Sequence, residues 1–255
     1  MQAVDYFSLA FRWIHIVAGV LWIGLLYFFN FVNGPFTATM DGETKKKVVP
    51  ELMPRALYWF RWGAAYTWIT GVFLLYFIFE SGSNYLANPS TATAASRFIF
   101  YSFLLAPFIY DMLAKSPLAK NPKVFASIGF ILICGVIYLM QCCGGLGYRG
   151  YMIYTGAMFG SIMAYNVWFR IWPSGQKIIN GIKNGSPADA SVVALAASRS
   201  KHNTYLSVPL IWTMINLHSA AMAGDCAWLI LSGIILIGWC IVMLLYKKAA
   251  KIKGF

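Results

Sequence analysis

The sequence predicts an all-α integral membrane protein, a bundle of about seven transmembrane helices. Of its 255 residues, 60% are hydrophobic and only 11% are charged, whereas a soluble domain carries about a quarter charged residues. The apolar residues gather in long stretches, and a hydrocarbon core about 30 Å thick needs roughly 20 apolar residues per helix. Seven such stretches use nearly the whole chain, so residues 1–255 are expected to form a single transmembrane domain.

Each apolar stretch is long enough to cross a membrane as a helix. Helices are favoured because a backbone in lipid must satisfy its own hydrogen bonds. None of the stretches alternates with the period of two that is typical of barrel strands. The expected spans are residues 7–32, 57–79, 96–114, 124–141, 151–172, 204–223 and 227–246. A separate surface helix is expected over residues 188–200, since Asp189 near its start and Arg199 near its end suit the helix dipole.

The basic residues predict the orientation of the bundle. The net charge is +12, and 15 lysines and arginines lie in the odd-numbered connections and the C-terminal tail. The opposite side of the bundle shows only Arg97 and Arg149. Because Lys-rich and Arg-rich loops stay in the cytoplasm, the N-terminus is expected outside and the C-terminus in the cytoplasm. This placement of the charge in loops argues against a nucleic-acid-binding protein.

Two of the three histidines, His15 and His218, lie within expected spans, where an ionisable side chain is costly and is a candidate for function. At 1.5 Å per residue, both are expected about 6 Å to the outer side of the membrane midplane. Two imidazoles at matched depth on different helices are what bis-histidine ligation of a b-type haem requires. Imidazole also suits zinc and copper, and the alternative is that each histidine only hydrogen-bonds a neighbouring helix.

The surroundings of His15 fit a haem site. Gly19 is one turn away and has no side chain to keep a flat macrocycle from the helix. Arg12 lies on nearly the same face and is expected to meet a haem propionate or an anionic substrate. A covalently attached c-type haem is excluded because the sequence contains no C-x-x-C-H. His202 is expected at the cytoplasmic interface, where a solvated histidine is ordinary.

Two pairings remain open from the sequence. Asp111 could pair with Arg61 or Arg170, since all three are expected near the cytoplasmic ends of their helices. Cysteines 142 and 143 in the fourth connection and cysteine 226 in the sixth are expected at the outer, oxidising face. A disulfide between the two connections is therefore a hypothesis.

Four segments resemble the bacterial membrane-bound urate oxidase (urate hydroxylase) family. Arg12-Trp13-Ile14-His15, followed by a glycine at 19 and Trp22-Ile23-Gly24, is similar to the opening helix of that family. Residues 58–71 are similar to its second helix and residues 156–167 to its fifth. The strongest similarity is His202-Asn203-Thr204-Tyr205-Leu206-Ser207-Val208-Pro209, continuing through residues 214–218.

The resemblance implies a membrane domain of seven to eight helices in the bacterial inner (cytoplasmic) membrane and an oxidation coupled to cytochrome c. It marks His15, His202 and His218 as the family-like histidines. His202 with Asn203 and Tyr205 would form a second polar cluster that binds substrate or a quinone head group. Family members commonly continue into a C-terminal cytochrome c domain, whereas this sequence ends at Phe255. The segment before the last histidine also departs from the S-N-H-Y ending of the family.

Together these observations predict a membrane-bound oxidoreductase or electron-transfer subunit. Haem b between the first and sixth spans, on His15 and His218, would pass electrons between a urate-like substrate or quinol and an outer-face cytochrome c. The expected partners are the lipid bilayer and a cytochrome c or another electron-transfer subunit, in a membrane complex or a homo-oligomer. The alternative is a cofactor-free structural subunit of a larger respiratory complex. A transporter is the least supported, because no span shows a Gly/Pro break matched in a second repeat.

Overall fold

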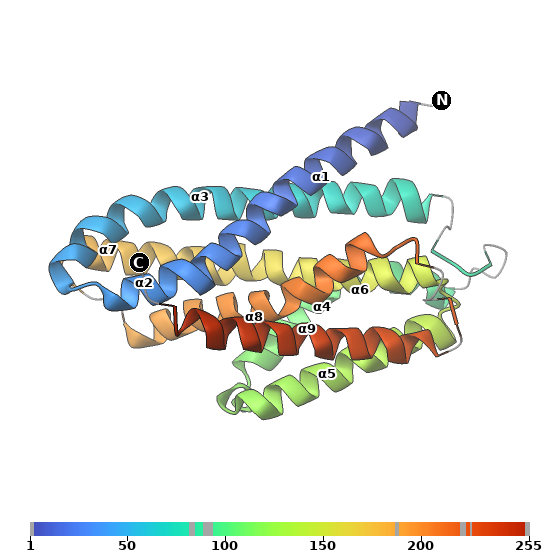
Figure 1. Ribbon diagram of the computed structural model, residues 1–255. Coiled ribbons are helices and arrows are strands. Elements are labelled where there is room, and N and C mark those ends of the chain that lie inside the picture. The colour runs from blue at the N-terminus through green and yellow to red at the C-terminus, as the bar shows by residue number, and fades with distance from the viewer. Residues whose placement is uncertain are drawn as a thin grey trace. The chain divides into compact units, whose positions relative to one another are not determined.

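The computed structural model describes residues 3–81, 85–88, 94–186, 189–219, 223–224 and 226–252. In this part of the chain the structure consists of long helices joined by short connections (Figure 1). The extended structure found there is one isolated antiparallel bridge between Leu86 and Leu146. The all-α prediction is therefore confirmed for the residues described.

The α-helices are α1 (Ala3–Tyr27), α2 (Gly34–Thr39), α3 (Gly42–Leu74), α4 (Ala94–Lys115), α5 (Pro122–Tyr138), α6 (Tyr148–Asn166), α7 (Trp172–Lys183), α8 (Ala190–Ile215) and α9 (Ala227–Ala249). Wider π-helical turns extend four of them: η1 (Phe28–Asn33), η2 (Leu75–Glu80), η5 (Leu139–Cys143) and η6 (Val167–Ile171). A short 3₁₀ turn, η4 (Pro117–Lys120), precedes α5. Because η1 joins α1 to α2 and η6 joins α6 to α7, these pairs run on as continuous helical segments.

A long helix overlaps each of the seven expected spans. Four stretches are long and apolar enough to cross a membrane: Tyr6–Thr39, Gly42–Glu80, Pro122–Cys143 and Ala227–Ala249. Their mean hydropathy reaches 2.6 in the last of them, while only 11% of the apolar window in the first is buried within the protein. Apolar helices with such exposed surfaces need an apolar solvent, so this is a membrane protein. The full number of spans and the sidedness remain predictions.

Helix α6 shows why an interior helix can be less apolar than its neighbours. Residues Tyr151 to Thr155 are all buried, as are Ser161 and Asn166 further along the helix. A helix that is enclosed by protein can carry polar side chains as long as they find hydrogen-bond partners. Thr155, for example, donates to the carbonyl oxygen of Tyr151 at 2.7 Å.

Two boundaries differ from those expected. The separate surface helix over residues 188–200 is instead the first half of α8, which runs without a break from Ala190 to Ile215. The sixth span, expected to reach residue 223, ends at Ile215, and the chain turns there. The side chain of Asn216 donates to the carbonyl oxygen of Trp212 at 3.0 Å, and Ser219 N–H bonds Asn216 O at 3.1 Å. The backbone N–H of Asn216 donates to the same carbonyl oxygen of Trp212 at 3.1 Å, so the last helical hydrogen bond is made at this residue.

The chain divides into two compact units. The first contains Met1–Ser8, Val72–Ile162 and Val208–Trp239. The second contains Leu9–Gly71, Met163–Ser207 and Cys240–Phe255. Each unit is described by itself below.

In the first unit a glutamine side chain joins the two connections for which a disulfide was considered. All five cysteines are free thiols, so the disulfide hypothesis is not supported. Instead, the Gln141 side-chain amide donates to Gly224 O at 3.0 Å, and its oxygen accepts from Trp228 N–H at 2.8 Å. The two bonds satisfy backbone groups at the start of α9 without a covalent link.

Aspartates begin two of the helices in the second unit. Asp41 Oδ1 accepts from the backbone N–H groups of Glu43 and Thr44 at 2.9 and 3.0 Å, and Oδ2 accepts from the Thr44 hydroxyl at 2.6 Å. Asp189 Oδ1 accepts from Ser191 N–H at 2.6 Å, as its expected place at a helix start implies. The hydrogen bond from the Thr44 hydroxyl holds the pKa of Asp41 below its usual value. Both residues act as N-caps.

We expect Asp41→Ala to loosen the first turn of α3, measured as faster amide hydrogen exchange at residues 43–46. Asp41→Asn keeps a capping oxygen and is the matched control, so it should exchange at nearly the wild-type rate. Because the folded pKa of Asp41 is lowered, its carboxylate contributes stability above about pH 4, and this is lost as the pH falls through the folded value. Equal exchange in wild type and Asp41→Ala at pH 7 would contradict this role.

Candidate functional site

Helix α1 packs against α3 through a stripe of small residues in the second unit. Gly63, Thr67 and Gly71 follow one another at one-turn intervals along α3. A methyl group added at Gly63 would lie 3.3 Å from the carbonyl oxygen of Ala18, and one added at Gly71 would lie 3.0 Å from Cε1 of His15. Small residues let two helix backbones approach closely in a membrane. The stripe therefore brings the imidazole of His15 against α3.

Two groups of α3 fix the ring of His15. Its Nδ1 lies 2.8 Å from the carbonyl oxygen of Thr67 and 3.2 Å from the hydroxyl oxygen of Thr70. A carbonyl oxygen only accepts, so Nδ1 carries the proton in the first of these bonds, and neutral imidazole then presents Nε2 as an acceptor. Metal-binding histidines are commonly oriented by such a bond from the second ring nitrogen to a carbonyl. The geometry thus suits Nε2 as a metal ligand.

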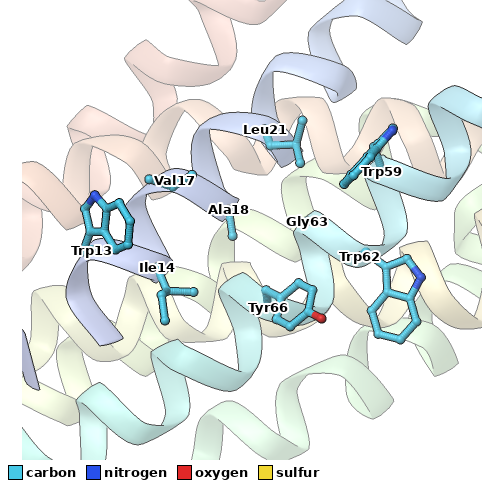
Figure 2. Close-up of a pocket in the computed structure, with 9 residues that line it drawn as sticks. All are labelled: Trp13, Ile14, Val17, Ala18, Leu21, Trp59, Trp62, Gly63 and Tyr66. Atoms are coloured by element: carbon cyan, nitrogen blue, oxygen red, sulfur yellow. The ribbon is translucent and has the colours of Figure 1, made fainter. Parts of the chain in front are cut away.

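An apolar groove of about 300 Å³ lies between the same two helices. Figure 2 shows α1 contributing one wall and α3 the other. It is lined by Trp13, Ile14, Val17, Ala18, Leu21, Trp59, Trp62, Gly63 and Tyr66. Trp13 and Trp59 are 71% and 57% exposed, so the groove is open along an apolar surface of the second unit.

Arg61 is surrounded by aromatic rings. Its guanidinium carbon lies 4.0 Å from the ring centre of Trp172 and 5.5 Å from that of Trp168. These distances are within the range of cation–π attraction, which keeps the charge of Arg61 beside ring faces. Asp111, considered from the sequence as its partner, forms an ion pair with Lys115 on its own helix at 2.7 Å.

Asn30, in the π-helical turn η1, joins three helical segments. Its amide nitrogen donates to the Ser200 hydroxyl oxygen at 2.8 Å and to the carbonyl oxygen of Leu26 at 2.9 Å. Its amide oxygen accepts from the Tyr246 hydroxyl at 2.8 Å. Tyr246 in turn stacks on Tyr205, with ring centres 6.1 Å apart. One side chain therefore connects α1–η1, α8 and α9.

A second polar pair is fully buried. Asn166 Nδ2 donates to Asn203 Oδ1 at 2.8 Å, and Asn203 Nδ2 donates to the carbonyl oxygen of Met163 at 2.9 Å. Both Asn166 and Asn203 have no exposed surface. The amide of Asn203 thus holds α8 to α6, which is the usual role of an asparagine between transmembrane helices.

Next to Asn30 lies a cavity of about 410 Å³ within the second unit. Its polar lining consists of Asn30, Asn33, Ser200, Lys201 and Tyr246. The remaining lining is Phe29, Gly34, Val49, Met53, Leu57, Ile171, Gly175, Ile178, Ile179, Ala196 and Ala197. A concave, mostly apolar space with a few polar groups is the ordinary form of a small-molecule site.

The residues expected to hold a haem lie in different units. His15, Arg12 and Gly19 belong to the second unit and His218 to the first. His218 is exposed in the turn after α8 rather than inside a helix. Arg12 is exposed on α1, while Gly19 faces α3, because a methyl group there would lie 3.8 Å from Cγ2 of Thr67.

The expected polar cluster of His202, Asn203 and Tyr205 lies beside the cavity but does not line it. Asn203 is committed to the buried pair, and Tyr205 packs on Tyr246. The preceding residues of α8, Ser200 and Lys201, line the cavity instead. Sequence reasoning did not single out Ser200, Lys201 or the residues of η1, because their proximity depends on long-range packing.

A comparison with known protein families shows to which family this chain belongs. The model of the urate oxidase N-terminal family matches residues 39–254. This chain belongs to that family. The resemblance inferred from the sequence is thereby confirmed. No curated protein and no solved structure matches the chain.

The part that matches the urate oxidase N-terminal family includes most of the cavity wall but not all of it. Lys201 and Tyr246 lie inside the matched range, whereas Asn30 and Asn33 precede residue 39. The cavity is thus formed by the family region together with the helix that comes before it. The family places this chain among urate-oxidase-related membrane proteins.

We expect Asn30→Leu to lower the free energy of unfolding by about 1–3 kcal/mol, because the part-buried hydroxyls of Ser200 and Tyr246 would lose their hydrogen-bond partner. Tyr246→Phe, which removes one bond and keeps the ring, should cost only about 0.5–1.5 kcal/mol. Denaturant unfolding of the detergent-solubilised variants measures both values. An Asn30→Leu variant as stable as Tyr246→Phe would show that Asn30 does not join these helices.

Proposed function

We propose that this protein is a membrane-bound oxidoreductase that acts on urate or a closely related substrate through a b-type haem. Membership of the urate oxidase N-terminal family supports the substrate. The observation that carries the haem is the orientation of His15, whose Nδ1 is bound to the Thr67 carbonyl oxygen at 2.8 Å. Such a bond is typical of histidines that hold a metal through the other nitrogen.

His15 and His218 would be the residues that hold the haem iron, and Arg12 would meet a propionate. The surroundings of His15 fit this role, because the Thr67 carbonyl fixes the tautomer and Gly71 leaves space for the ring. The exposed position of His218 leaves its imidazole open to a ligand. When bound, the haem would supply one-electron transfer. The protein side chains would hold it, and the Thr67 carbonyl oxygen would orient the imidazole of His15.

The proposal includes a direction across the membrane. The lysine distribution supports a cytoplasmic C-terminus, with electrons leaving to a cytochrome c at the outer face of a bacterial inner membrane. In this orientation the lysine-rich end, which includes Lys177, Lys183 and Lys201, faces the cytoplasm. The competing role is a cofactor-free subunit that assembles a larger respiratory complex.

The reduced-minus-oxidised visible spectrum of the purified protein, with a pyridine haemochrome assay, tests the haem. We expect a b-type signal that falls at least tenfold in His15→Ala, since a residue that would hold the haem iron is lost. Ile16→Ala removes a neighbouring side chain that is 57% exposed and is the matched control, which should keep the signal.

Protein yield and melting temperature show whether each variant is folded. Absence of haem from wild-type protein supplied with haem, or full haem content in folded His15→Ala, would overturn the haem proposal. If the purified protein contains no haem and a larger respiratory complex fails to assemble without it, the assembly role is supported instead.

A further inference from the structure

The cavity beside Asn30 has features of a ligand site that the proposed haem does not use. Its volume of about 410 Å³ is within the range of small-molecule pockets, roughly 300–1,000 Å³. All of its lining residues belong to the second unit, and His15, Arg12 and Gly19 are not among them. The cavity is therefore separate from the residues proposed to bind haem in that unit.

Two π-helical turns border the cavity. Phe29, Asn30 and Asn33 come from η1, and Ile171 ends η6. A π-helical turn is rare and is frequent at functional sites, where the wider turn redirects side chains. At η1 this turn directs both asparagines to the same cavity. The wall opposite includes Gly175, where a methyl group would lie only 3.0 Å from Leu57.

The polar groups at the cavity are not all used in packing. Asn30 is committed to Ser200, Leu26 and Tyr246. Asn33, by contrast, makes one weak side-chain contact, from its amide nitrogen to the sulfur of Met53 at 3.5 Å. Its amide can therefore both donate to and accept from a ligand.

Lys201 gives the cavity a positive charge. Its ammonium group lies 5.6 Å from the ring centre of Tyr246. Among the residues that the structure describes, Lys201 takes part in none of the ion pairs found, which include Lys46–Glu43, Arg55–Glu51 and Lys115–Asp111. Lys201 is itself exposed, so its ammonium group lies at the rim of a largely apolar cavity. A lysine in this position favours an anionic ligand.

We propose that this cavity binds a small planar anion with amide-type N–H and C=O groups, such as a purine-derived anion. The apolar walls suit the faces of a flat ring, the Asn33 amide suits its edge, and Lys201 suits its charge. The choice of urate as a probe rests on the proposed function, whereas the preference for an anion rests on Lys201 alone. A strongly hydrated anion such as phosphate gains little from apolar walls.

Equilibrium dialysis of radiolabelled urate against the purified protein tests the site directly and requires no haem or turnover. We expect saturable binding that weakens at least tenfold in Lys201→Met, about the value of one hydrogen bond to a charged group, and also weakens in Asn33→Leu. Lys177→Met removes a charge from an exposed position on α7 that does not line the cavity. This control should bind urate as wild type does.

Competition identifies the ligand class. Excess inorganic phosphate and an uncharged short-chain quinone should each leave urate binding unchanged. Displacement by phosphate would show a general anion site, displacement by the quinone would show a quinone site, and either result overturns the proposal. Wild-type affinity in Lys201→Met, or no urate binding by the wild type, would also overturn it. Because the haem spectrum is measured separately, failure of this site and failure of the haem proposal are distinguishable.

Discussion

A polar group removed from water has to find its partner inside the protein, and the second unit is organised by this constraint. The Asn30 amide bonds a backbone carbonyl of its own helix and two hydroxyls, those of Ser200 and Tyr246. Asn203 is satisfied in the same way by Asn166 and by the carbonyl of Met163. Since lipid cannot replace these partners, each bond restricts which helices can be neighbours. The cavity is left where the packing is incomplete, next to side chains that the network already holds in place.

The positions of the helices could be predicted well from the sequence because hydropathy is a local property. Each of the seven expected spans falls on a long helix. The errors concern where helices begin and end, because local hydropathy does not determine those boundaries. The polar first half of α8 was expected as a separate surface helix, but a helix continues through polar residues as long as its backbone bonds remain unbroken. The sixth span was expected to continue to residue 223 because the sequence stays largely apolar there, whereas α8 ends at Ile215.

The candidate site was only partly predictable for the same reason. The spacing of Gly63, Thr67 and Gly71 is visible in the sequence and could have indicated a close helix contact, but not that His15 would lie against it. The cluster expected around His202 is next in sequence to Ser200 and Lys201, which line the cavity. It could not identify Lys201 as the residue at the cavity, because that depends on η1, which lies far away in the chain. A π-helical turn has no reliable local signal, since it differs from an α-helix by a single shift in bonding.

A high-resolution structure of the protein in a lipid nanodisc, determined with urate present, tests the central claim most directly. The account predicts density for a flat ligand in the cavity beside Asn30, with the ammonium of Lys201 and the amide of Asn33 at hydrogen-bond distance from it. It also predicts that the Asn30, Ser200 and Tyr246 bonds are the same with and without the ligand, because the network is formed in advance. Urate bound elsewhere, or a cavity filled by lipid while urate binds in solution, would contradict the account.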